Sequence, residues 1–92
     1  MKRNFELFFR KPFVLIMLSL LNSPMNKTRL ARRNGLSYSH VIRLLDALND
    51  MGITETENHG RSDVVRLTEE GTKIAKEVKE IVEILSLKEG LE

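Results

Sequence analysis

The chain has 92 residues, a net charge of +2 at pH 7, two histidines and no cysteine. This length supports one small core, so we expect a single domain over residues 1–92, with residues 80–92 extending its last helix. The missing cysteines exclude disulfides, thiolate metal sites and cysteine nucleophiles, and they are typical of a protein in the reducing cytoplasm.

Charge is unevenly distributed along the chain. Residues 1–45 hold nine basic residues and one acid, whereas residues 46–92 hold six basic and twelve acidic residues. The two halves therefore carry net charges of +8 and −6. A strongly basic first half predicts a polyanionic partner.

The N-terminus begins like a signal peptide, because basic residues precede the apolar run 13–21. No small-x-small cleavage site follows, Glu6 interrupts the leader, and a membrane span needs about 20 apolar residues. We therefore predict neither secretion nor a membrane span, and we interpret residues 12–22 as a core helix with Pro12 in its first turn. Helical spacing predicts one further turn before it, at Phe5, Phe8 and Phe9.

Capping residues divide the next segment into two helices. Asn26 can cap a helix over residues 27–34, and Gly35 can end it in the left-handed conformation. Ser37 can cap a third helix, residues 37–51. Apolar side chains recur along this helix with a period that predicts one buried face, at Val41, Leu44, Leu45, Leu48 and Met51.

Two short strands are predicted next, "ITETEN" (53–58) and "DVVRLT" (63–68), with a turn around Gly60 between them. Thr68 can cap a last helix of roughly 30 Å that runs to about Lys88, with acids in its first turn. The predicted fold class is mainly α with a small β-hairpin, that is, α+β.

The segment "KTRLARRNGLSYSHVIRLLD" resembles a helix-turn-helix, with Ala31 small at the helix crossing and Gly35 at the turn. The continuation "MGITETENHGRSDVVRLTEEGTKIAKEV" resembles a winged-helix hairpin, and its "LTEEG" is similar to the segment that leaves the wing in MarR-type regulators. Residues 12–80 thus resemble a MarR-like winged helix-turn-helix transcriptional regulator. The resemblance implies a three-helix core, a two-stranded wing over residues 55–63 and a long C-terminal helix.

Asn34 departs from this pattern, because the motif usually places an apolar residue there. Either the second helix is looser at this point, or the amide caps its C-terminus.

A recognition helix is held from behind by apolar packing while its N-terminal turns enter the major groove, where short polar groups and arginine read base edges. The helix at 37–51 fits, with Ser39 and Arg43 facing outward. Asp46 and Asp50 continue the same face, and phosphate repels carboxylates, so only the first two turns should insert. We predict binding to double-stranded DNA through Lys27, Thr28, Ser37, Tyr38, Ser39, His40, Ile42, Arg43, His59 and Arg61.

Each contact has an alternative that involves no DNA. Arg43 could pair with Asp46, Ser37 is a cap in any case, and Tyr38 could pack over the edge of the core. The remaining polar residues could be solvated, although Arg61 beside glycine suits a narrow minor groove and Lys27 at a helix start suits a phosphate. The fold also permits another function, a winged-helix module whose basic face binds an acidic protein.

The sequence offers no catalytic constellation. Ser39 and His40 are adjacent, so on a helix they point about 100° apart. The two histidines are nineteen residues apart, with no carboxylate at metal-ligand spacing, and no glycine-rich phosphate loop is present. We therefore predict no enzyme activity, no metal and no cofactor.

The last helix repeats apolar residues at intervals of four, three and four, and a domain this small covers only its first half. Such a seam of heptad character predicts a homodimer formed by Phe5, Phe8, Val78, Ile81, Val82 and Leu85. The alternative is that the Phe5–Phe9 segment covers the remainder of the helix within one subunit.

Overall fold

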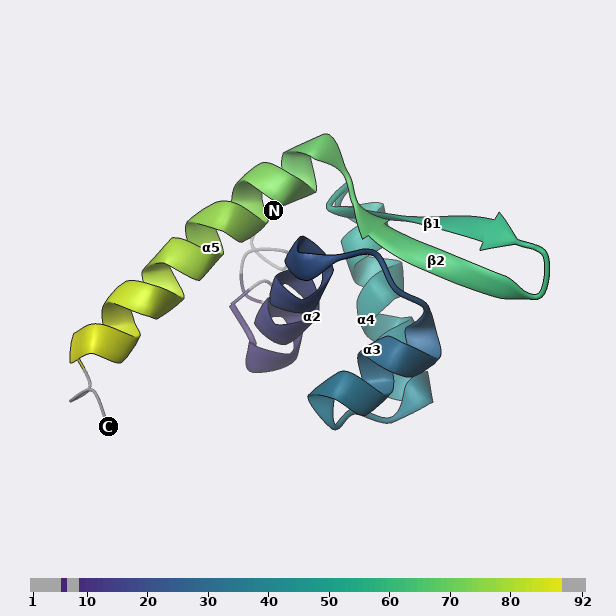
Figure 1. Ribbon diagram of the computed structural model, residues 1–92, viewed down its shortest axis with the longest axis horizontal. Coiled ribbons are helices and arrows are strands. Elements are labelled where there is room, and N and C mark those ends of the chain that lie inside the picture. The colour runs from purple at the N-terminus through teal and green to yellow at the C-terminus, as the bar shows by residue number, and fades with distance from the viewer. Residues whose placement is uncertain (1–5, 7–8, 89–92) are drawn as a thin grey trace.

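The computed structural model describes residue 6 and residues 9–88 (Figure 1). The elements follow the order predicted from the sequence. They are α2 (Lys11–Asn22), α3 (Lys27–Asn34), α4 (Tyr38–Asp50), β1 (Thr54–His59), β2 (Ser62–Leu67) and α5 (Glu69–Lys88). Both ends of each strand lie one residue from the predicted bounds. Phe5 and Phe8 lie outside the described residues. No helix of the described chain is long and apolar enough to cross a bilayer.

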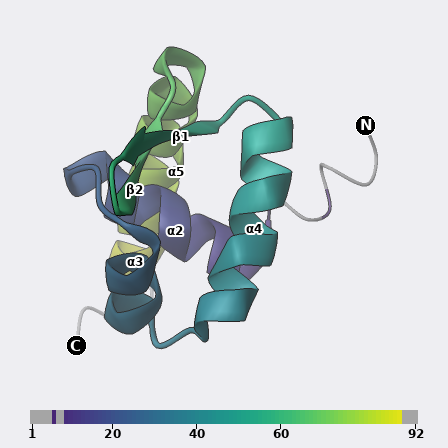
Figure 2. The same cartoon turned by 90° about the vertical axis from the view of Figure 1, so that its right-hand side faces the viewer.

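Helix α2 is the central element of the fold, with α5 on one side and α3 and α4 on the other (Figures 1 and 2). The helix is apolar on most of its surface because neighbours cover it on several sides. Pro12 lies in its first turn, as predicted. The buried side chains of α2 are Phe13, Ile16, Met17, Ser19 and Leu20.

The predicted caps set the turn between α3 and α4. The Asn26 side chain accepts a hydrogen bond from the Arg29 amide at 2.7 Å, and the Ser37 hydroxyl accepts one from the His40 amide at 3.1 Å. Gly35 ends α3 with φ 65°, which only glycine adopts without strain. These caps fix where α4 begins.

Asn34 caps α3, which was one of its two predicted roles. Its amide nitrogen donates to the Leu30 carbonyl and to the Ser19 hydroxyl, each at 3.0 Å. Ser19 is buried in α2, so the pair satisfies a polar group in the core. The polar residue at this position therefore links two helices.

The wing is an antiparallel hairpin that pairs Thr54 with Leu67 at its root and His59 with Ser62 at its tip. Figure 1 shows it projecting from the helical body. Met25 adds one further pair at the root: its amide donates to the Val65 carbonyl at 3.1 Å, and the Val65 amide donates to its carbonyl at 2.9 Å. The root of the wing is thus fixed to the segment between α2 and α3.

Helix α5 begins with a very close approach to the backbone before β1. The Gly71 amide donates to the capping Thr68 hydroxyl at 2.9 Å. A Cβ atom at Gly71 would overlap the Ile53 carbonyl oxygen, so glycine is required there. Ala75 and Val78 complete the buried face of α5.

The core joins all three helices of the helix-turn-helix region to the wing root and the start of α5. Its fully buried members include Ile16, Leu30, Val41, Leu48 and Val65. Within α5, Val78 is the last residue of the core, and every described residue beyond Lys79 is exposed.

Candidate nucleic-acid interface

Helix α4 separates its apolar and polar residues sharply. Val41, Leu44, Leu45 and Leu48 are buried, whereas Ser39 and Arg43 are exposed on the outer face, as predicted. Arg43 forms no ion pair with Asp46 or with any other acid of the described chain. Its guanidinium is thus available to an external acceptor. Asp46 and Asp50 are exposed further along α4.

The N-terminal part of α4 and its cap hold four further predicted contacts. The exposed Ser37 serves as the cap and also lies 3.4 Å from the Ser39 hydroxyl. Tyr38 is 51% exposed, so it does not pack into the edge of the core. His40 and Ile42 are half-buried on either side of the outer face.

Three elements meet beside Tyr38 in a hollow of about 180 Å³. They are the start of α3, the start of α4 and the end of the wing. The hollow brings together four predicted contacts, Lys27, Thr28, Tyr38 and Arg61, and it is also lined by Asn26, Ser62 and Asp63.

Lys27 has a partner that sequence reasoning missed. Its ammonium lies 3.5 Å from the Asp63 carboxylate of β2, and both side chains are partly buried. Asp63 also accepts a hydrogen bond from the Asn58 amide at 3.0 Å. Asp63 therefore offsets part of the positive charge at the start of α3.

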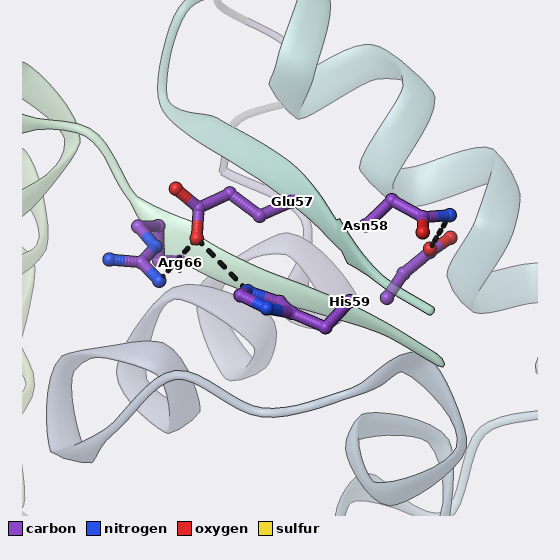
Figure 3. Close-up of polar contacts among 5 residues, drawn as sticks. Glu57, Asn58, His59 and Arg66 are labelled. Atoms are coloured by element: carbon purple, nitrogen blue, oxygen red, sulfur yellow. Dashed lines mark hydrogen bonds and ion pairs between the residues drawn. The ribbon is translucent and has the colours of Figure 1, made fainter. Parts of the chain in front are cut away.

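The outer face of the wing carries a second unpredicted network (Figure 3). Glu57 accepts a hydrogen bond from Arg66 at 2.7 Å, and the same oxygen lies 3.2 Å from the His59 ring nitrogen. His59 thus points along the strand toward Glu57. Arg61, unlike Arg66, forms no ion pair within the described part of the chain, so its guanidinium is available to an external anion.

On another side of α4, the N-terminal end of α2 contributes a residue that sequence reasoning missed. Arg10 lines a hollow of about 490 Å³ together with His40 and Arg43. The signal was its position directly before a predicted helix, but only the fold shows that α2 begins beside α4. A further hollow lies over the exposed face of α3 and is lined by Asn26, Thr28, Arg29, Arg32 and Arg33.

Over residue 6 and residues 9–88, no group of three histidine, aspartate or glutamate side chains is placed to hold a metal ion.

The C-terminal half of α5 exposes large apolar side chains. Ile81 and Leu85 are 52% and 53% exposed, and Val82, Ile84 and Leu87 are exposed as well. Val78, which we predicted in a dimer seam, is 9% exposed and belongs to the core of its own subunit. The apolar surface that remains therefore starts at Ile81.

Residues 12–86 match the family model described as winged helix-turn-helix, and the chain belongs to this family. An uncharacterized protein of Archaeoglobus fulgidus is 33% identical over 48 residues, which are 52% of this chain and 50% of that protein. The chain thus aligns with about half the length of this relative.

Solved structures show the same fold. The crystal structure of AF1382 from Archaeoglobus fulgidus matches with a TM-score of 0.79 and 24% identity over 87% of this chain and 93% of that one. A MarR family transcriptional regulator of Silicibacter pomeroyi matches with 0.79 and 24%, over 86% and 58% of the two chains. A mutant of ZitR from Lactococcus lactis matches with 0.81 and 21%, over 90% and 60%. The predicted MarR-like winged fold, with its helices and two-stranded hairpin, is confirmed.

Proposed function

We propose that this protein is a small homodimeric transcriptional regulator that binds double-stranded DNA in a sequence-specific manner. The observation that carries the proposal is the division of α4 into a face buried along its whole length and an exposed polar face at its N-terminal half. The relative from Silicibacter pomeroyi is named a MarR family transcriptional regulator, and it shares the fold.

In this proposal the first two turns of α4 enter the major groove. Arg43 presents two donors that match the O6 and N7 acceptors of guanine, and the Ser39 hydroxyl suits either donor or acceptor groups of base edges. Ile42 contributes a methyl group that can contact thymine. Asp46 and Asp50 limit the insertion because phosphates repel them.

The hollow beside Tyr38 supports two further contacts with DNA, one at the start of α3 and one on the wing. Lys27 and Thr28 lie at the start of α3, where backbone amides and the helix dipole favour a phosphate. Arg61 lies across the same hollow on the tip of the wing, and we assign it to the adjacent minor groove, whose negative potential attracts arginine.

We further propose that two copies pair through the exposed apolar end of α5, which includes Ile81, Val82 and Leu85. Water contact with these side chains costs free energy that a second copy removes. A two-fold dimer places two α4 helices about one helical turn of DNA apart, so the preferred site is an inverted repeat.

The proposal is tested by selecting duplexes from a random library and measuring binding by fluorescence anisotropy at several salt concentrations. We expect the selected duplex to bind at least about 10³-fold more tightly than a scrambled duplex, with a steep fall of affinity with salt. Equal affinity for both duplexes would contradict sequence-specific reading. The absence of DNA binding at low salt would favour the alternative of an acidic protein partner.

A further inference from the structure

The hollow between α2 and α4 concentrates positive charge, and none of the described residues in its lining is acidic. Arg10 and Arg43 both line it, together with His40. Neither arginine forms an ion pair within the described chain. Two unpaired guanidinium groups that share one hollow repel each other, and an anion placed between them removes that repulsion.

This hollow and the one beside Tyr38 lie on opposite sides of α4. Tyr38 lines one and His40 lines the other, and two residues of helix separate them by about 160° around the axis. The outer residue Arg43 belongs to the second hollow. The helix that we assign to the major groove is thus flanked by a cationic site on each side.

The two sites differ in net charge. Beside Tyr38, Asp63 lies in the lining and pairs with Lys27 at 3.5 Å. Among the described residues, no acid lines the hollow that contains Arg10. Relative to the number of cations in its lining, the hollow that contains Arg10 therefore attracts a polyanion more strongly than the hollow beside Tyr38.

The floor of the hollow indicates what kind of anion it suits. Phe13 and Leu44 line it but are only 3% and 6% exposed, because the core already covers them. Covering these two side chains would therefore add little to the binding free energy of an apolar ligand. The charged groups of the site are Arg10 and Arg43, and their guanidinium groups suit a phosphodiester.

We propose that Arg10 and His40 hold the DNA backbone strand on the side of α4 opposite the wing, so that the helix is clamped between two phosphate contacts. This inference rests on the proposed function and adds α2 to the interface. Arg10 precedes α2 directly, and the Phe13 and Val14 amides donate to its carbonyl, so the contact relies on its side chain.

The test compares Arg10→Ala with Arg10→Lys and with Lys79→Ala, an exposed control that removes one charge from the far helix α5. For Arg10→Ala we expect the slope of log affinity against log salt to fall by about one unit for each bound subunit. Near 0.1 M salt this amounts to roughly an eightfold loss per subunit, equal on selected and scrambled duplexes. Arg10→Lys should keep the slope, and Lys79→Ala should leave affinity unchanged.

A second measurement locates the contact on the DNA. Replacing single phosphates of the selected duplex by neutral methylphosphonates should weaken the wild-type protein at a backbone position outside the region read by α4. Arg10→Ala should be insensitive at that same position, because its partner is already lost.

The inference is overturned if wild-type protein binds DNA and Arg10→Ala keeps the full salt slope. It is also overturned if Arg10→Ala leaves DNA binding intact but abolishes nuclear magnetic resonance shifts that hexanoate causes at Ala47, since the hollow would then be a ligand site. If the wild-type protein binds no DNA, the proposed function itself fails. These results are therefore distinguishable.

Discussion

Helices α4 and α5 both bury one face, yet they expose opposite kinds of surface. Helix α4 is packed along its whole length by residues such as Val41 and Leu48, and what it exposes is polar. Helix α5 is packed only as far as Val78, and its last two turns expose Ile81 and Leu85.

A polar surface held rigidly from behind suits a hydrated, charged partner. An exposed apolar surface lowers its free energy only when other apolar groups cover it. The two helices therefore suit the two partners that we propose, DNA at α4 and a second copy at α5. Substitutions on the two helices should separate these roles.

The largest effect is expected at the end of α5. Replacing Ile81 and Leu85 by aspartate should convert the dimer to a monomer, because charges cannot be buried in an apolar seam. Each molecule then holds one half-site, so DNA affinity should fall by about 10²- to 10⁴-fold. Light scattering and anisotropy would measure both changes.

The matched control replaces Glu80 and Glu83, which are exposed in the same turns, by alanine. It should remain a dimer. A wild-type protein that scatters light as a monomer at micromolar concentration would contradict the seam.

At the start of α5 the expected effect is on folding. Gly71→Ala forces a methyl group into the Ile53 carbonyl, and overpacking of this kind costs about 1–3 kcal/mol of unfolding free energy. Urea denaturation would measure it. Lys73→Ala, two residues later and exposed, should change the unfolding free energy by less than about 0.5 kcal/mol. Equal stability of the two variants would contradict the close approach.

On the outer face of α4 the expected effect is on sequence discrimination. Arg43→Ala should weaken binding to the selected duplex by about 1–3 kcal/mol, with little change on a scrambled duplex and none in stability. Arg43→Lys keeps the charge but loses the two-donor fork, so it should retain the salt slope and lose discrimination. If Arg43→Ala weakens both duplexes equally, α4 is not the reading helix.

Lys27→Ala should weaken both duplexes alike and lower the salt slope by about one unit for each subunit. Asp63, the ion-pair partner of Lys27, provides the complementary variant. Asp63→Asn leaves the ammonium unpaired and should strengthen binding to both duplexes. Anisotropy titrations over a salt series would show both changes, and a loss of discrimination in Lys27→Ala would contradict a phosphate contact.

The smallest effect is expected on the wing. Glu57→Gln removes a negative charge near His59, and a unit charge about 10 Å from a phosphate in water is worth ~0.4 kcal/mol. Binding to both duplexes should therefore tighten about twofold, and the gain should vanish at high salt. Glu77→Gln, exposed on α5, is the control. A twofold gain in that control would indicate a general charge effect.

The elements of this fold could be predicted because each boundary is set by nearby residues. Asn26 and Ser37 cap helices through bonds to amides three residues away, and Gly35 supplies the left-handed turn. The buried face of α4 likewise follows from the spacing of its leucines. These signals come from residues that are close together in the chain, so they can be recognised in a single sequence.

Contacts between distant segments could not be predicted in this way. Lys27 and Asp63 are 36 residues apart, and Glu57 meets Arg66 only when the register of the hairpin is known. Val78 shows the same limit, because its spacing suits a seam and only the packing of α5 places it in the core. Arg10 was missed for this reason as well.

The pair between Met25 and Val65 has a consequence for dynamics. Amides at the wing root are tied into the core, whereas the tip around Gly60 is held by the hairpin itself and by the partly exposed pair of Asp63 with Lys27. Amide hydrogen exchange should therefore be slowest at Val65 and become progressively faster toward the tip. In the complex with DNA that we propose, a wing with a rigid root and a more mobile tip can follow local variation in groove width while the helix-turn-helix keeps its position.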